Sequence, residues 1–213
     1  MKKFRAFSLA EILLTLMIIG VIAGMTIPAL RKNTMNRTVA TNLKKAYSEL
    51  NQATALAMTT NEVDKLYRSG IFDSQNNFDK EFVYKYFSVM RECPSGSSND
   101  CAGGSNFQNN KTYLLSNGIA LNFDYCLSGG WAENPFTCNV FVDVNGPKAP
   151  NKGGSDQFMM GINTHDGRVY LGSYSSRNNE RADFDDGCEN GDDYQMAWAC
   201  GAKIMLDGWQ IKY

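Results

Sequence analysis

The sequence has few of the residues on which most enzymes and metal sites depend. It contains one histidine, His165, and no Cys-x-x-Cys pair. It has no Gly-x-Ser-x-Gly motif, no phosphate-binding Gly-x-x-x-x-Gly-Lys motif and no nucleophile with a histidine nearby in the sequence. We interpret His165 beside Asp166 as a turn residue and not as a catalytic base. These absences argue against catalysis, and we expect a protein that is not an enzyme.

An excess of basic charge is also lacking. The chain has 21 Lys and Arg against 22 Asp and Glu, a formal net charge of −1 at pH 7. A nucleic-acid-binding protein usually has an excess of basic residues, which this chain lacks. No internal repeats are found. With 213 residues, 43% hydrophobic and 20% charged, the composition suits one globular domain in addition to an apolar N-terminal segment.

The N-terminal segment lacks charge almost completely. From Phe7 to Leu30 the only formally charged side chain is Glu11. About 20 consecutive apolar residues are enough to cross a bilayer as a helix, so the sequence predicts membrane insertion. Insertion of an ionisable group at the bilayer centre costs roughly 2.5–3.5 kcal/mol of free energy. We therefore expect an ionisable residue in such a segment to have a functional role. The alternative is a plain anchor in which Glu11 is an incidental polar residue near the interface.

The residues around the start of this segment carry a resemblance. A secretory signal peptide has an apolar core of about 7–15 residues, and the core here is longer. The basic stretch 1–6, the small residue Ala6, Phe7, Glu11 as the fifth residue from that Phe, and Pro28 near the end resemble the leader and methylation motif of type IV pilins and type II secretion pseudopilins. The family usually has Gly where this chain has Ala6.

The resemblance implies processing and assembly. A prepilin peptidase would cleave between Ala6 and Phe7 and Phe7 would be N-methylated, which removes three basic residues and leaves 18 basic against 22 acidic, a net charge of −4. The helices would then pack into a filament, in which Glu11 compensates the N-terminal amine of a neighbouring subunit's Phe7 and favours the correct axial register. The expected partners are other subunits, in a homo- or hetero-filament, the prepilin peptidase and an inner-membrane assembly platform, with no nucleic acid.

The resemblance also implies a location and an organisation. The chain would be a single-pass protein of the bacterial inner membrane, with a cytoplasmic N-terminus before processing, and then part of a periplasmic or cell-surface filament. Its expected parts are the leader at residues 1–6, a transmembrane and polymerisation helix at 7–30, an amphipathic half of the same helix at 31–60, and an extracytoplasmic globular domain at 61–213.

The helical period continues beyond Pro28 and predicts one helix from about Ser8 to about Met58. Its second half has an apolar stripe, opposite a polar face, that we expect to pack on the globular domain. The fold class is therefore predicted to be α+β, and the resemblance implies a type IV pilin-like arrangement with a long helix on a small antiparallel sheet. The stripe consists of residues at steps of three and four: Val39, Leu43, Ala46, Tyr47, Leu50, Ala53 and Ala57.

Weaker patterns predict the remaining elements. A second helix is expected around residues 78–90, with Asn76 or Asn77 as its N-cap, followed by a loop at residues 95–110. An Asn117-Gly118 turn between apolar runs predicts a hairpin of residues 111–115 and 119–123. Short connections make the sheet antiparallel. Further strands are expected at 139–144, 157–163 and 168–171, and a final helix or strand within 194–213.

Six cysteines lie in the distal part of the chain. An even number of cysteines beyond a membrane segment predicts three disulfides. We favour the pairs nearest in sequence among the connectivities that six cysteines allow. Metal binding is the alternative, but the single histidine has no partner. The predicted pairs are Cys93 with Cys101, Cys126 with Cys138, and Cys188 with Cys200.

The glycine-rich loop 143–156 gathers oxygen ligands. Asp143, Asn145 and Asp156 could converge on Ca²⁺, which prefers six to eight oxygens, and calcium in a C-terminal loop is a feature of the major pseudopilins that the chain resembles. The alternative is an Asx-rich loop that satisfies its own backbone. The calcium-like loop favours a pseudopilin, whereas three disulfides favour a pilin or minor pilin.

Two further groups of residues leave alternatives open. An acidic cluster around Cys188 is either solvated surface or a contact for a cation or a basic partner. The three tryptophans are either core residues or the ligand site of a minor or tip subunit that acts as an adhesin. The acidic cluster is Asp183, Asp185, Asp186, Glu189, Asp192 and Asp193, and the tryptophans are Trp131, Trp198 and Trp209.

Overall fold

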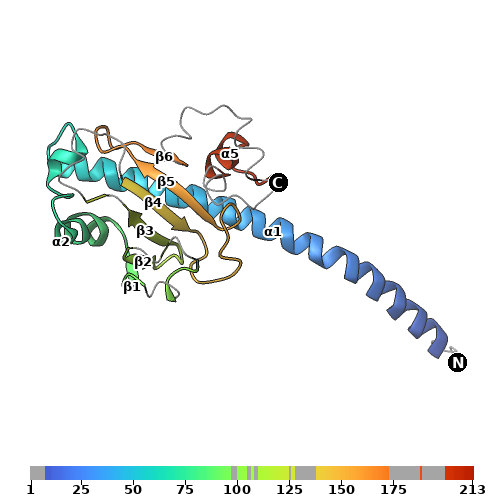
Figure 1. Cartoon of the computed structure of the whole chain (residues 1–213). Coiled ribbons are helices and arrows are strands. Elements are labelled where there is room, and N and C mark those ends of the chain that lie inside the picture. Colours follow the sequence, from blue (N-terminus) through green and yellow to red (C-terminus); the bar gives the residue numbers. More distant parts are fainter. Residues whose placement is uncertain are drawn as a thin grey trace, which may run out of the picture. The chain divides into compact units, whose positions relative to one another are not determined.

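The structure is a computed structural model that describes residues 8–96, 100–104, 107, 110–124, 126–127, 138–172, 188 and 200–213. The chain forms two compact units, which divide between Thr38 and Val39. The first contains the first part of helix α1, and the second contains the rest of α1 and all the strands (Figure 1). The fold is α+β, as predicted, with a long helix packed on an antiparallel sheet.

Helix α1 (Leu9–Thr60) is 52 residues long and ends close to the predicted position. Pro28 lies inside it. Because proline has no backbone N–H, the carbonyl of Gly24 loses its usual donor there. The helix nevertheless continues to Thr60.

The end of α1 is a Schellman motif. The N–H of Val63 donates to the carbonyl of Met58 at 3.1 Å, and the N–H of Glu62 donates to the carbonyl of Thr59 at 3.2 Å. Glu62 has φ 53°, in the left-handed region that usually favours glycine. A hydrogen-bonded cap therefore stops the helix although no glycine is present.

In the described part of the chain, six strands form one sheet, in which every strand pairs antiparallel with the next. The predicted hairpin is confirmed: the N–H of Leu115 donates to the carbonyl of Ile119 at 2.8 Å, and Gly118 has φ 84°. The three later strands also match their predicted ranges closely. The strands are β1 (Val89–Cys93), β2 (Thr112–Leu115), β3 (Ala120–Asp124), β4 (Cys138–Asp143), β5 (Gln157–Ile162) and β6 (Val169–Leu171).

The second predicted helix is correct in position but wrong at both ends. Its N-cap is Ser74, whose hydroxyl accepts from the N–H of Asn77 at 3.2 Å, and not Asn76 or Asn77. Met90 lies in strand β1, because this segment pairs with β2. The short helical elements are η1 (Leu66–Ser69), α2 (Gln75–Phe78), the π-helix η2 (Asp79–Val83) and α3 (Tyr84–Tyr86).

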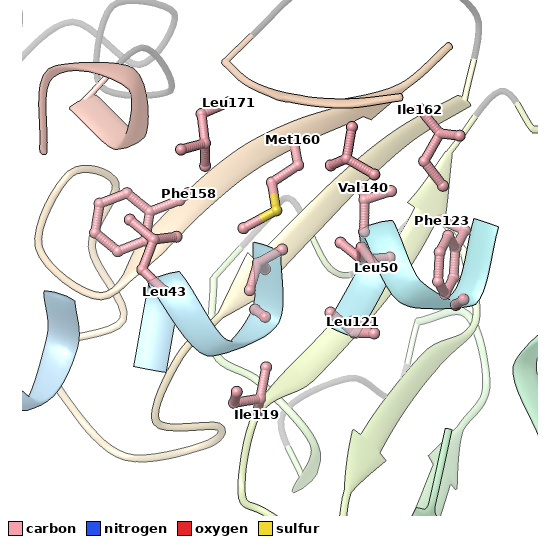
Figure 2. Close-up of a cluster of buried hydrophobic side chains, with 14 of the residues drawn as sticks. Leu43, Leu50, Ile119, Leu121, Phe123, Val140, Phe158, Met160, Ile162 and Leu171 are labelled. Atoms are coloured by element: carbon pink, nitrogen blue, oxygen red, sulfur yellow. The ribbon is translucent and has the colours of Figure 1, made fainter. Parts of the chain in front are cut away.

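The main core lies between the second half of α1 and one face of the sheet. In Figure 2, Leu43 and Leu50 of α1 point toward Phe158 and Val140 of the sheet, and both leucines are completely buried. Burial of a leucine side chain stabilises a fold by about 1.5–3 kcal/mol. The predicted stripe is therefore confirmed. Its buried members are Val39, Leu43, Ala46, Leu50, Ala53 and Ala57, with Tyr47 partly buried against them.

A second, smaller core covers the opposite face of the sheet. Phe141 and Met159 from neighbouring strands pack there with Phe107 and Ala102. Cys93 and Cys101 belong to the same cluster, and their disulfide ties this covering loop to strand β1. The loop predicted at residues 95–110 therefore has a packing role in its described part.

Three disulfides join the cysteine pairs that are nearest in sequence, as predicted. The last one holds helix α5 (Cys200–Leu206), which packs on β5 and β6. The final segment is thus helical at this point. After it, the ring of Trp209 lies 5.8 Å from that of Tyr47, and the Nζ atom of Lys44 lies 5.7 Å from the Trp209 ring centre. Trp209 is a packing residue, whereas Trp131 and Trp198 lie outside the described residues.

Candidate functional site

The first part of α1 has apolar side chains on every side. Leu13, Leu14, Leu16 and Met17 follow one another around the helix and are between 58% and 69% exposed. No described side chain in residues 8–30 is buried. Residues 9–30 rise about 33 Å, compared with about 30 Å for the hydrocarbon core of a bilayer. Among the described residues, α1 is the one helix that is long and apolar enough to cross a membrane.

The few polar side chains in residues 8–30 all have partners in their own helix. The hydroxyl of Thr15 donates to the carbonyl of Ile12 at 2.8 Å, and that of Thr26 donates to the carbonyl of Ile22 at 2.9 Å. A polar group without a partner in hydrocarbon costs several kcal/mol. These internal hydrogen bonds suit a helix that has no water around it.

Glu11 forms a capping box with Ser8. Its carboxylate accepts from the N–H of Ser8 at 2.8 Å and from the Ser8 hydroxyl at 2.9 Å, and the N–H of Glu11 donates to the Ser8 Oγ at 3.3 Å. We did not predict this contact, although Ser-x-x-Glu before an apolar run is its usual signal. Ala6 and Phe7 lie outside the described residues, so their processing and the pairing of Glu11 with an amine stay predictions.

The structure brings Asp143 and Asp156 together at the base of the predicted calcium loop. Both side chains are completely buried. Asp143 accepts from the N–H of Asn145 at 3.2 Å and from Nε2 of Gln157 at 2.9 Å. Asp156 accepts from the N–H groups of Asn151 at 2.9 Å and Lys152 at 2.7 Å. Each of the four carboxylate oxygens therefore has a donor from the chain itself.

The electrostatics of this loop are unfavourable for two charged carboxylates. Burial raises the pKa of Asp143 to about 7, and the nearby Asp156 charge adds to the rise. Burial also raises the pKa of Asp156. Asn145 donates from Nδ2 to the carbonyl of Ala149 at 3.3 Å, while its Oδ1 is buried with no hydrogen-bond partner in the part of the chain that the structure describes.

Two carboxylates and one amide make a small part of the shell that Ca²⁺ requires. Among the described residues there is no group of three or more His, Cys, Asp and Glu side chains that could hold a metal. The geometry fits a loop that is closed by its own hydrogen bonds, and calcium binding by Asp143, Asn145 and Asp156 stays a prediction.

A polar network that we did not predict connects α2 and η2 with the sheet. Lys111 lies 2.7 Å from Asp79 and 2.8 Å from Glu92. Asp79 also accepts hydrogen bonds from Gln75, at 2.5 Å, and from the hydroxyl of Tyr113. Burial lowers the pKa of Lys111, but the two carboxylates outweigh it and raise the pKa overall, whereas the hydrogen bond from Lys111 lowers the pKa of Glu92. The network holds the short helices on the sheet, and a cavity of about 10 Å³ lies beside Gln75, Lys111 and Tyr113.

The turn with the single histidine has no catalytic arrangement in its described surroundings. The N–H of His165 donates to Oδ1 of Asn163 at 2.9 Å, and the centre of its ring lies 5.0 Å from that of Tyr67, with the two ring planes tilted by 41°. Asp166 accepts from the N–H of Arg168 at 3.0 Å. Both residues shape the turn before β6. The acidic cluster around Cys188 lies outside the described residues.

No known protein family, no curated protein and no solved structure matches this chain.

Proposed function

We propose that this protein is a filament subunit of the type IV pilin or type II secretion pseudopilin kind. Residues 7–30 insert in the bacterial inner membrane, the leader at residues 1–6 is removed by a prepilin peptidase, and the mature helix packs with the helices of other subunits. The domain beyond residue 60 is extracytoplasmic, and the protein has no enzymatic activity.

One observation carries the proposal. A single helix has an apolar surface on all sides in its first part, with every described polar side chain satisfied internally, and a buried apolar stripe in its second part. Such a helix needs lipid or other apolar helices around its first part and is fixed to a globular domain by its second part. A subunit that is held in the membrane and then polymerises requires both of these features.

The first experiment tests processing. The full chain is expressed in bacterial membranes with and without a prepilin peptidase, and the mature N-terminus is determined by mass spectrometry. We expect a peptidase-dependent loss of residues 1–6 and a methylated Phe7. An Ala6→Asp variant serves as the control that blocks cleavage. Cleavage elsewhere, such as after residue 24, indicates an ordinary signal peptide and contradicts the proposal.

The second experiment separates the charge of Glu11 from its capping role. Glu11→Gln keeps an oxygen that can accept from Ser8 but removes the charge, whereas Glu11→Val removes both. We expect both variants to insert in the membrane and both to be lost from sheared filaments, since the charge pairs with a neighbouring subunit's amine. Normal incorporation of Glu11→Gln would show that the carboxylate acts only as a cap.

The role of a tip subunit or adhesin, with a ligand site formed by tryptophans, has less support. The described member, Trp209, packs on Tyr47 and Lys44 of α1. Immunoelectron microscopy of sheared filaments separates a subunit along the whole shaft from one confined to the tip.

A further inference from the structure

The positive charges of α1 are gathered in one stretch of the helix. Residues 12–48 contain five of the chain's 21 basic residues and none of its 22 acidic ones. The first of the five, Arg31, directly follows the apolar residues 9–30. A chain whose formal net charge is −1 therefore has a strongly basic region immediately after its most apolar one. The five basic residues are Arg31, Lys32, Arg37, Lys44 and Lys45.

The first three of these residues, Arg31, Lys32 and Arg37, form what we call the basic collar. Their side chains are exposed. Residues 9–30 rise about 33 Å, so when they span a hydrocarbon core of about 30 Å, the collar begins at its edge. Arg37 lies about 10 Å further along the axis. Helical side chains tilt toward the N-terminus, which turns all three back toward the membrane.

The collar surrounds the helix. At 3.6 residues per turn, Lys32 is rotated by about 100° and Arg37 by about 240° from Arg31. The three side chains therefore leave the helix in three different directions. A partner protein contacts a helix mainly on one face, whereas lipid head groups surround a spanning helix on all sides. The distribution of the charges matches a lipid surface.

No negative charge lies near the collar along α1. The hydroxyl of Thr34 donates to the carbonyl of Leu30 at 2.9 Å, and that of Thr38 donates to the carbonyl of Thr34 at 3.0 Å. These neighbours are neutral and are satisfied within the helix. The next acidic residue of α1 is Glu49, about 18 Å beyond Arg37, which is more than the Debye length of about 8–10 Å in physiological salt.

We propose that the basic collar binds the head groups of anionic phospholipids, in the leaflet next to the globular domain. A guanidinium group donates two parallel hydrogen bonds to one phosphate, and the ammonium group of Lys32 acts as a compact point charge. The apolar stems of these side chains lie along the edge of the hydrocarbon. This inference rests on the proposed membrane insertion of residues 7–30 and adds the class of lipid that holds the inserted subunit.

The chain contains a matched control for the collar. Lys44 and Lys45 are also adjacent and basic, but they lie about 20 Å beyond Leu30 along α1, where an anionic surface is screened. Both have contacts within the domain: Lys44 lies 5.7 Å from the centre of the Trp209 ring, and Lys45 lies 3.9 Å from the carboxylate of Glu49. These two lysines should contribute little to the binding of lipid.

The experiment uses the full chain in phosphatidylcholine bilayers with a trace of one spin-labelled lipid, either phosphatidylglycerol or phosphatidylcholine. Electron spin resonance measures the fraction of each label that is held next to the protein. A basic residue near an anionic lipid favours association about fivefold, so we expect about this preference for phosphatidylglycerol at about 0.1 M salt. The preference should disappear at about 1 M salt. Equal association of the two labels at low salt overturns the proposal.

Two pairs of substitutions locate the binding. Arg31→Gln with Lys32→Gln removes two charges of the collar and keeps good helix formers, and the preference for phosphatidylglycerol should fall below about twofold. Lys44→Gln with Lys45→Gln removes the same charge from the control positions and should keep the preference of the unmodified chain. An equal loss in both pairs means that only the net charge matters, and it contradicts a site at the collar.

Two further outcomes separate this site from the filament role. A chain that inserts and is cleaved after Ala6, but associates equally with both labels, leaves the proposed function intact and removes only the lipid site. A chain that the bilayers do not retain overturns both proposals. If chemical cross-linking gives dimers that are lost in Arg31→Gln with Lys32→Gln, while the two labels associate equally, the collar binds a second copy of the chain and the lipid proposal is wrong.

Discussion

The two parts of α1 use apolar side chains in opposite ways. In residues 9–30 they surround the helix and are exposed, as Leu16 shows with 61% exposure. From Val39 to Ala57 they form a single stripe that is buried against the sheet, as Leu50 shows with 0% exposure. The same residue type therefore stabilises the folded domain in one part and remains exposed in the other.

The polar residues follow the same division. Near the N-terminus, Ser8 and Glu11 are satisfied by each other and by their own helix. In the second part, Asn42 donates to the carbonyl of Val144 at 2.9 Å and Asn51 accepts from the N–H of Val169 at 3.3 Å. The first part is self-contained, as a helix in an apolar environment must be. The second part is joined to the sheet by polar and apolar contacts alike.

The largest expected effect tests this division directly. Leu50→Ala should lower the free energy of unfolding of the domain by up to about 5 kcal/mol, because it leaves a cavity in the core. Leu16→Ala removes the same atoms from an exposed position and should leave domain unfolding unchanged. Denaturant titration of the full chain in detergent, followed by near-ultraviolet circular dichroism, measures both.

An equal loss in Leu16→Ala and Leu50→Ala would contradict the division. It would mean that the first part of α1 contributes to the stability of the domain as much as the buried stripe does.

The second prediction concerns the buried carboxylates, which occur in the domain and not in residues 8–30. The pKa of Asp143 is about 7 in the folded chain, against an ordinary value of 3.8. Between these values the folded state holds more protons, so stability is greatest below pH 4 for this group and is lost as the pH rises to 7. The full effect is roughly 4 kcal/mol at most.

Asp143→Asn is the control for this titration. Its melting midpoint should exceed that of the unmodified chain at pH 8, and the difference should shrink as the pH falls to 4. Parallel pH profiles would show that Asp143 does not titrate in this range. Because chain donors already occupy all four carboxylate oxygens, we expect millimolar calcium to leave the midpoint at pH 7 unchanged, and a clear rise would establish a cation site.

The structural features that could be predicted from the sequence depend on local patterns of residues. The stripe on α1 follows from helical periodicity, and the β2–β3 turn follows from Asn117-Gly118, because only neighbouring residues decide these features. The disulfides followed from sequence proximity. The capping box of Ser8 and Glu11 is also a local feature, since the spacing of the two residues alone signals it.

The structural features that were not predicted from the sequence depend on contacts between residues far apart in the chain. Met90 follows Phe82 and Tyr86 at helical spacing, but its segment is a strand because Val89 and Cys93 pair with residues at the two ends of β2. The polar network depends on the contacts of Asp79 with Lys111 and Tyr113, which are 32 and 34 residues away. Periodicity and spacing carry no information about such contacts.

The third prediction tests the N-terminal end of α1. Ser8→Ala removes the hydroxyl of the capping box and should destabilise the first turn by about 1 kcal/mol. Amide hydrogen exchange in residues 9–12 should then be about fivefold faster in detergent. The melting midpoint of the domain should not change, and a lower midpoint would show that the two parts of α1 unfold together.

The smallest expected effect tests the other end of the same helix. Glu62 is exposed and has φ 53°, a conformation that disfavours every residue with a Cβ atom. Glu62→Gly removes this strain but increases the freedom of the unfolded chain, so the net gain should be about 0.5 kcal/mol. Because this end belongs to the packed part of α1, the gain should appear in the melting midpoint of the domain, unlike the effect of Ser8→Ala. Glu62→Ala keeps the Cβ atom and should show no gain, and if it matched Glu62→Gly, the effect would come from the lost charge and not from the backbone.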